Sequence, residues 1–184
     1  MRTIPMDHHL IEQCRAGDTS AVEHFVQTYQ QELYRLALSI LDDSNEAEEV
    51  TQEALLAALR ALDAFHGASS FKTWLFSITV NICRTRLQRH KRQDQLKQIM
   101  DGILKRQPAP SVEERAIQNE SNEALWRAIH GMNEKHRIPI VLRYYHDLSV
   151  AEIANILQIP EGTVHSRLNT ARRLLHAVLK EGSL

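Results

Sequence analysis

The segment from residue 148 to residue 175, LSVAEIANILQIPEGTVHSRLNTARRLL, constrains the fold more than any other part of the chain. Ser149 and Glu152 have the spacing of a capping box, in which each side chain binds a backbone N–H of the first helical turn. The Gln-Ile-Pro segment ending at Pro160 then interrupts the apolar pattern, because proline lacks a backbone N–H and fixes φ. The sequence therefore predicts two helices joined by a short turn, one beginning near Ser149 and the next around residues 160–162.

The second of these helices has an apolar face and a polar face. Val164, Leu168 and Ala171 recur at three- and four-residue spacing, which is the period of a helix face. The other faces carry hydrogen-bonding side chains, namely Thr163, His165, Ser166, Asn169, Thr170 and Arg173. In a helix-turn-helix the amino end of the second helix meets base edges in the major groove, while the first helix crosses the phosphates. The pattern favours this use over the alternative, an αα-hairpin that serves only for packing.

Composition indicates a helical protein of one or two domains. The 184 residues are 43% hydrophobic and 24% charged, with only six glycines and five prolines. No apolar run approaches the roughly 18 residues that a membrane span needs, and the first ten residues lack the apolar core of a signal peptide. We therefore expect a cytoplasmic protein without membrane insertion.

Charge is segregated along the chain, although the net charge is only −1. Residues 1–66 hold 4 lysines and arginines against 12 aspartates and glutamates, a balance of −8, whereas residues 82–106 hold 8 against 2, a balance of +6. A basic segment suits a phosphate backbone, and an acidic surface suits a basic protein partner. The sequence thus implies two different partners.

The acidic half reads as successive amphipathic helices, with apolar positions at residues 10–14, 25–29 and 33–41. Residues 42–45 form a polar turn, and Ser44 or Asn45 is suited to cap the helix that follows. One face of that helix presents acidic and amide side chains at helical spacing, namely Glu46, Glu49, Gln52 and Glu53. A merely solvated face has the same pattern, so the partner assignment needs further support.

Aromatic and basic side chains come together in the segment 65–92, FHGASSFKTWLFSITVNICRTRLQRHKR. A short loop containing Gly67 precedes a helix with one apolar face and one face rich in lysine, arginine and asparagine. Such a mixture suits single-stranded DNA, because rings stack on unpaired bases, amides read base edges and arginines hold phosphates. For Phe71 and Trp74 the alternative, burial in the core, is the stronger expectation.

No catalytic or metal-binding pattern is found among the ten histidines and two cysteines. There is no H-x-x-x-H or C-x-x-C spacing, no glycine-rich phosphate loop and no G-x-S-x-G turn. Cys14 and Cys83 occupy apolar helix positions, where we expect buried thiols. A metal site from His8, His9 and Cys14 is only a weak hypothesis. We therefore expect neither enzymatic activity nor a cofactor.

Three blocks of this sequence together resemble the bacterial sigma factors of the sigma-70 family, in particular the extracytoplasmic-function group with only the second and fourth sigma regions. They are EAEEVTQE at 46–53, the block at 65–92 and the helix-turn-helix at 148–175. The blocks occur in the family's order and, with the helices around them, cover nearly the whole chain. The resemblance implies an all-α protein with two small helical domains joined by a flexible linker: residues 1–95, 96–119 and 120–184.

The resemblance also implies partners and contact residues. The acidic helix would bind the clamp helices of the largest subunit of core RNA polymerase through Glu46, Glu49, Gln52 and Glu53, and the polymerase flap is a further partner. The second block would melt and read the minus-10 promoter element, with a flipped base held in a pocket. Its implied contacts are Phe65, His66, Gly67, Ala68, Ser69, Ser70, Lys72, Asn81, Arg84, Arg86 and Arg89. The implied minus-35 contacts are Thr163, His165, Ser166, Arg167, Asn169, Thr170, Arg172 and Arg173.

The chain departs from the family pattern at a few positions. His165 and Thr170 stand where relatives frequently have arginine, so fewer bidentate contacts to guanine are available and the minus-35 sequence should differ. Pro139 lies inside a predicted helix, where it removes one backbone hydrogen bond. Neither departure removes an implied contact residue.

The sequence therefore predicts a promoter-specificity subunit that recruits core polymerase, opens the minus-10 region and anchors at minus-35. An alternative is a stand-alone helix-turn-helix regulator, which binds duplex DNA unaided and as a dimer on a two-fold site. A pure interaction module is a third class, and it would lose nothing when Arg84 and Arg86 are replaced. The resemblance further implies an anti-sigma protein as a partner, although no motif in the chain identifies one.

Overall fold

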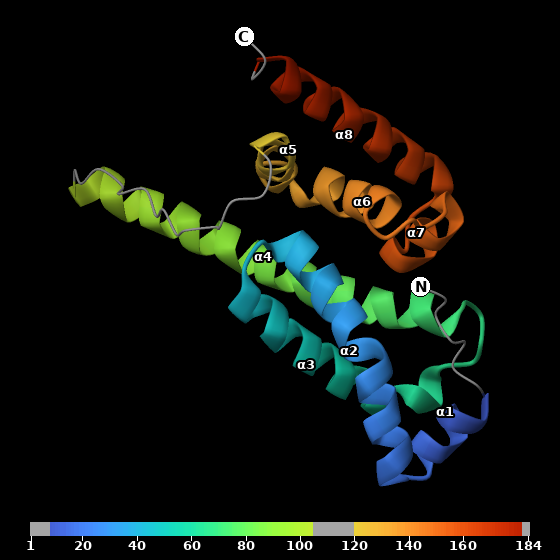
Figure 1. The fold of residues 1–184 in the computed structure, drawn as a ribbon. Coiled ribbons are helices and arrows are strands. Elements are labelled where there is room, and N and C mark those ends of the chain that lie inside the picture. Colours follow the sequence, from blue (N-terminus) through green and yellow to red (C-terminus); the bar gives the residue numbers. More distant parts are fainter. Residues whose placement is uncertain (1–7, 105–119, 182–184) are drawn as a thin grey trace.

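The computed structural model describes residues 8–104 and 120–181, and every regular element in these ranges is helical (Figure 1). The elements are α1 (His8–Arg15), α2 (Thr19–Leu41), α3 (Ser44–Arg60), the short 3-10 helix η1 (Leu62–Ala64), α4 (Phe71–Leu104), α5 (Glu120–His130), α6 (Glu134–Tyr144), α7 (Val150–Leu157) and α8 (Glu161–Glu181). The all-α prediction is confirmed.

The amino-terminal domain is a bundle of α2, α3 and α4, with α1 packed on α2. Phe25 and Leu33 of α2, Val50 of α3 and Phe76 of α4 are completely buried in its core. The buried hydroxyl of Thr51 donates to the Ala47 carbonyl at 2.7 Å, so this polar group is satisfied inside its own helix. The two cysteines are buried free thiols, as expected.

The helix boundaries in this domain differ from the prediction in two ways. The apolar stretches 25–29 and 33–41 belong to one helix, α2, which is capped by Asp18 through its bonds to Ser20 N and Ala21 N. The cap of α3 is Asp43, whose carboxylate accepts from Glu46 N at 2.8 Å. The prediction of Ser44 or Asn45 as the cap was therefore wrong by one or two residues, because Asp43 already has the extended backbone that a cap requires.

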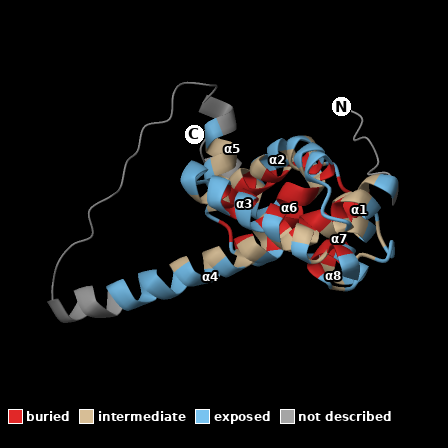
Figure 2. Ribbon diagram, turned by 90° about the horizontal axis from the view of Figure 1, so that it is seen from below, coloured by how far each residue is buried: buried red, intermediate tan, exposed pale blue. Residues whose placement is uncertain are grey.

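Helix α4 is the longest element and extends beyond the body of the molecule (Figure 2). Its first half lies in the bundle, and its described residues from Lys91 to Lys97 are exposed. The helix continues to Leu104, so the first part of the predicted linker, residues 96–104, is helical. The remainder of that linker, residues 105–119, lies outside the described residues.

The carboxyl-terminal domain contains α5 to α8. The predicted capping box at the start of α7 is confirmed: Ser149 Oγ accepts from Glu152 N at 3.2 Å, and Glu152 Oε2 accepts from Ser149 N at 2.8 Å. Helix α7 ends at Leu157, and its C-cap residue Gln158 has a left-handed backbone with φ of 54°. This turn redirects the chain into α8, so that buried Ile153 and Leu157 of α7 and Val164 and Leu168 of α8 share one core.

The two domains pack directly on each other, a contact that no sequence pattern predicted. Helix α7 lies against α4, and α6 lies against the carboxyl end of α2. Arg137 Nη1 donates to the Ile40 carbonyl at 3.0 Å, and His130 bridges the Ser39 carbonyl (3.2 Å) and the Asp42 carboxylate (3.0 Å). Arg137 and His130 of one domain therefore bind the carboxyl end of α2 in the other, where the helix dipole favours the positive charge of Arg137.

His146 lies at this domain interface. Its Nε2 lies 3.2 Å from Ser39 Oγ, and its ring meets the edges of Phe76 and Tyr145 at centroid distances of 5.5 and 5.0 Å. Burial, followed by the positive charge of Lys72, lowers the pKa of His146 from 6.5 to about 4. The imidazole is therefore neutral in the packed form at pH 7.

Acidification should weaken this interface through His146. Because the pKa is lowered in the folded state, the neutral ring contributes stability above pH 6.5 that is lost as the pH falls towards 4. Between pH 7.5 and 5.5 we expect wild type to lose about 1 kcal/mol more free energy of unfolding than His146→Gln, measured by denaturant titration. Identical pH profiles of the two proteins would contradict this role.

Candidate nucleic-acid interface

The polar face of α8 lies on the surface. Val164, Leu168 and Ala171 are buried against the rest of the helix-turn-helix, which fixes the rotation of the helix. Of the predicted contact residues on α8, the exposed ones are His165, Ser166, Asn169, Arg172 and Arg173, and the half-buried ones are Thr163, Arg167 and Thr170. The local apolar period thus directs hydrogen-bonding side chains outward along the helix that a major groove accommodates.

Among these described residues of α8, Arg172 forms a hydrogen bond and a ring contact with a side chain of another helix. Its Nε donates to the Tyr144 hydroxyl at 2.7 Å, and its guanidinium lies 5.8 Å from the centroid of the same ring. Tyr144 itself is more than half exposed, at 59%. The tyrosine therefore holds Arg172 along the surface of α6 while leaving it in solvent.

The loop at residues 66–70 is exposed but held at both ends. On the amino side, Arg15 Nη2 donates to the carbonyls of Leu62 (2.7 Å) and Phe65 (3.0 Å). On the carboxyl side, Ser70 Oγ accepts from Thr73 N at 3.0 Å and caps α4. Gly67 between them has a φ of +76°, a backbone conformation that other residues rarely adopt. These contacts therefore hold the exposed loop in one conformation at the amino end of α4.

Three aromatic side chains that flank this loop pack against one another. The rings of Phe65, Phe71 and Trp74 lie within 5.2–5.3 Å of one another, centroid to centroid. Phe71 is buried, as expected, whereas Phe65 and Trp74 are only half-buried. The cluster leaves parts of two rings at the surface beside the loop, which is where an unpaired base could stack.

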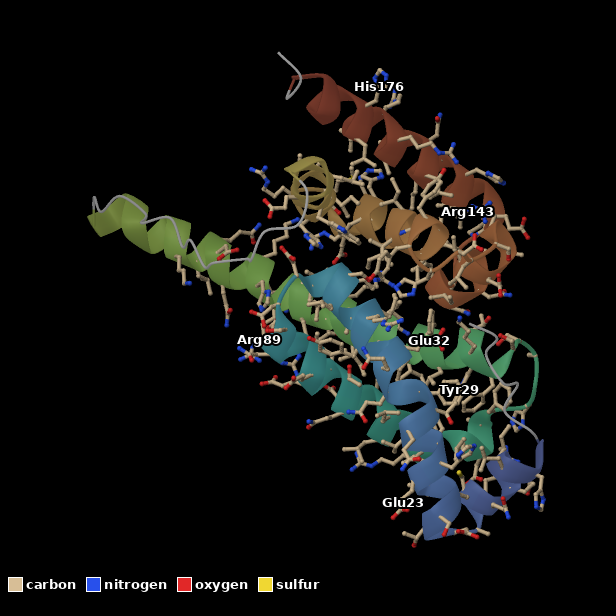
Figure 3. The ribbon with its side chains drawn as sticks, in the orientation of Figure 1. Glu23, Tyr29, Glu32, Arg89, Arg143 and His176 are labelled. Carbon is tan, nitrogen blue, oxygen red and sulfur yellow. The ribbon has the colours of Figure 1, made fainter. Side chains whose placement is uncertain are left out.

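Helix α4 carries the remaining predicted minus-10 residues. Asn81 and Arg89 are exposed, Arg84 is half-buried, and among the described residues neither Arg84 nor Arg89 forms an ion pair. Figure 3 labels Arg89 at the point where α4 leaves the bundle. Lys72, unlike Arg84 and Arg89, forms an ion pair: it pairs with Glu32 of α2, and its ammonium is 5.1 Å from the Phe76 ring centroid.

The acidic face of α3 lies beside α4 and is already paired with it. Arg86 Nη1 lies 2.9 Å from Glu49 Oε2, and Arg86 Nη2 lies 3.1 Å from Glu53 Oε2. His90 Nε2 lies 2.8 Å from Glu46 Oε1. The carboxylates of Glu49 and Glu53 raise the pKa of Arg86, because their hydrogen bonds favour the charged guanidinium. The structure thus brings Arg86, predicted as a DNA contact, onto the predicted polymerase-binding residues.

Two features of the interface could not be found from the sequence. Arg15 supports the loop from α1, 47 residues away from Leu62, and no local pattern marks it. The pairing of Arg86 with α3 likewise depends on how two helices pack.

Within the described ranges, no group of three or more histidine, cysteine, aspartate or glutamate side chains is arranged to hold a metal ion. None of the helices there combines the length and apolar character that a membrane crossing requires.

Family models match both halves of the chain: Sigma-70 region 2 matches residues 25–93 and Sigma-70 region 4 matches residues 122–175. The chain belongs to the sigma-70 family. It is 30% identical to the RNA polymerase sigma-H factor of Pseudomonas aeruginosa, covering 98% of this chain and 97% of the relative. It is 34% identical to the extracytoplasmic-function RNA polymerase sigma-E factor of Escherichia coli, covering 92% of each.

Solved structures agree on the fold. The structure of CnrH in complex with the cytosolic domain of CnrY has a TM-score of 0.67 at 24% identity, covering 95% of this chain and 97% of that one. The structure of the sigma factor RpoE with the anti-sigma factor NepR from Bartonella quintana has a TM-score of 0.66 at 23% identity, covering 86% and 96%.

As an extracytoplasmic-function sigma factor, the protein binds core RNA polymerase and directs transcription initiation at promoters with minus-10 and minus-35 elements. It is not an enzyme, since nucleotide addition belongs to the polymerase. Family membership decides against the alternative of a stand-alone helix-turn-helix regulator.

Replacement of Arg15 should disturb the loop. Arg15→Met removes the side-chain donor of the Phe65 carbonyl and leaves the Leu62 carbonyl with only its bond from Phe65 N, which costs about 1–3 kcal/mol in free energy of unfolding. We also expect weaker opening of the minus-10 region, measured by permanganate reactivity of promoter thymines. Arg60→Met, at an exposed position on α3, is the matched control and should change neither quantity.

Proposed function

We propose that this sigma factor divides its contacts among three surfaces. The acidic face of α3 binds the polymerase clamp helices, the loop with the exposed side of α4 reads the minus-10 element, and the polar face of α8 reads the minus-35 element. The observation that carries the proposal is that local apolar periods bury one face of each helix and leave these three faces on the surface. The proposed domains are residues 1–95 and 120–184, with 96–119 between them.

The charge of each surface suits its proposed partner. The carboxylates of α3 attract a basic partner, and Arg84 and Arg89 of α4 form no ion pair within the described ranges, so a phosphate can bind them. Asn81 is exposed on the same helix as a reader of base edges. On α8, the amide and hydroxyl groups supply donors and acceptors for base edges, and Arg167 and Arg173 supply positive charge.

The packed arrangement of the two domains is incompatible with binding both promoter elements at once. Elements named for positions 25 base pairs apart are separated by about 85 Å of B-DNA, at 3.4 Å per base pair. In the structure α7 lies directly on α4, so their axes are about one helix diameter apart, roughly 10 Å. We propose that the packed form belongs to the protein outside the promoter complex and that the domains separate on binding polymerase.

An anti-sigma protein is the proposed partner of the packed form. One solved structure of similar fold is a complex of a sigma factor with the anti-sigma factor NepR, and another is a complex with the cytosolic domain of CnrY. An open groove of about 820 Å³ lies between the domains, lined by Glu46 and His90 of the first domain and by His130 and Arg137 of the second, among others. A polypeptide in this groove would contact both domains at once. We propose the cytoplasm as the compartment, since the polymerase is there.

The function as a whole is tested by transcription in vitro. Purified protein is added to bacterial core RNA polymerase with a genomic DNA library, and start sites that depend on the protein are mapped. We expect a discrete set of start sites that share two upstream elements. Binding to duplex promoter DNA as a dimer, with no effect of added polymerase, would contradict the proposal.

Charge reversal on α3 should weaken polymerase binding. Glu49→Lys places a positive charge against a basic partner, and like charges across an interface cost several kcal/mol, so affinity for core polymerase should fall at least about tenfold. Glu23→Lys makes the same change in net charge on an exposed part of α2 near α1 (Figure 3) and should leave affinity within twofold. Equal effects of both variants would place the contact elsewhere.

A second substitution tests the minus-35 assignment through sequence preference. His165 is exposed on α8, and arginine there can make a bidentate contact to guanine O6 and N7. In a promoter library randomised at minus-35, His165→Arg should increase selection for guanine at one position by about tenfold or more. An unchanged preference at every position would remove His165 from the set of base contacts.

A further inference from the structure

One side chain, Arg86, belongs to both the proposed polymerase surface and the proposed minus-10 surface. It projects from α4, and its two terminal nitrogens bind two carboxylates that lie one helical turn apart on α3. The arginine side chain is 24% exposed, whereas Glu49 and Glu53 are 63% and 53% exposed. The pairing is therefore open to solvent, and another basic group can approach the same carboxylates from outside.

Because of this pairing, the carboxylates that we expect to bind polymerase already have basic partners within the protein. The acidic face of α3 carries three carboxylates, and each of them has a basic partner on α4: Glu46 has His90, and Glu49 and Glu53 have Arg86. Basic side chains of a partner must therefore compete with Arg86 for Glu49 and Glu53. Exposed ion pairs are weak and exchange readily with other partners, so basic side chains of a partner can displace Arg86 from these carboxylates.

Arg86 also lies next to the side chain expected to read DNA. A small surface pocket of about 200 Å³ is lined by Glu53 of α3 and by Asn81, Ile82, Thr85 and Arg86 of α4. One side of the pocket thus belongs to the acidic face and the other to the minus-10 helix. A change of side-chain conformation is enough to move the long arginine from the first to the second.

We infer that Arg86 couples polymerase binding to minus-10 binding by exchanging partners. In the protein alone, Glu49 and Glu53 hold Arg86. When basic side chains of the polymerase take these carboxylates, Arg86 is released and binds a promoter phosphate beside Asn81. The inference rests on the proposed polymerase contact of α3, and it adds a positioning role that family membership does not supply.

The partner exchange predicts effects of opposite sign on two affinities. Arg86→Gln removes the competitor, so affinity for core polymerase should rise about threefold at low salt. The same variant removes a phosphate contact, so the assembled holoenzyme should bind its promoter more weakly and with a salt slope lower by about one. A residue that merely pins α4 to α3 would lower both affinities together when it is replaced.

The experiment measures both affinities for the full chain and three variants. Core binding is followed by fluorescence anisotropy with labelled protein, and promoter binding by titrating holoenzyme on a promoter taken from the transcription mapping. Arg84→Gln is the matched control, since Arg84 is on the same helix and pairs with no carboxylate in the part of the chain that the structure describes. It should weaken promoter binding and leave core affinity unchanged.

Arg86→Lys adds an independent check that does not depend on removing the charge. Lysine keeps the positive charge but lacks the planar fork that reaches two carboxylates, so its effect on core affinity should lie between wild type and Arg86→Gln. Melting temperatures show whether each variant is folded. Should Arg86→Gln fail to fold, the comparison rests on Arg86→Lys.

Failure of the inference and failure of the proposed function give different results. If wild type does not bind core polymerase, or binds it equally well with Glu49→Lys, the assignment of α3 is wrong. If wild type binds through α3 but Arg86→Gln leaves core affinity unchanged or lowers it, the partner exchange is overturned. Undiminished promoter affinity in the Arg86→Gln holoenzyme overturns it as well.

Discussion

The packing of α4 is the constraint on which the rest of the structure depends. This one helix buries Leu75, Phe76 and Val80 against the amino-terminal bundle, and it is also the surface on which α7 of the second domain lies. Because the same helix presents Asn81 and the arginines to solvent, burial of its apolar face sets the direction of the side chains proposed to bind DNA. The loop in front of α4 is fixed by the Ser70 cap at its start.

The charged surfaces proposed for polymerase and for DNA lie close together and pair with each other. The acidic face of α3 and the basic face of α4 are neighbours, so charges that serve different partners neutralise one another in the protein alone. At the domain interface, His130 and Arg137 bind groups at the carboxyl end of α2 in a similar way. We propose that the Arg86 pairs, whose carboxylates are more than half exposed, are exchanged when polymerase binds, because exposed ion pairs are weak.

Much of the fold and of the candidate site could be predicted from the sequence. The capping box at Ser149, the burial of Phe71 and the outward face of α8 follow from local spacing, and the structure has them as expected. The cap at Asp43 and the extension of α4 to Leu104 were missed, because several neighbouring polar residues are all acceptable caps and a charged, exposed helix carries little apolar period.

The sequence by itself determined that the chain is helical, where the helix-turn-helix turns and which family the chain resembles, since caps, apolar periods and motif strings depend on residues within a few positions of one another. Only the tertiary structure decided that Arg86 binds Glu49, that Arg15 supports the loop and that His146 lies against Ser39. These contacts join residues 37, 47 and 107 positions apart. Contacts over such separations depend on how whole helices pack, which no local pattern encodes.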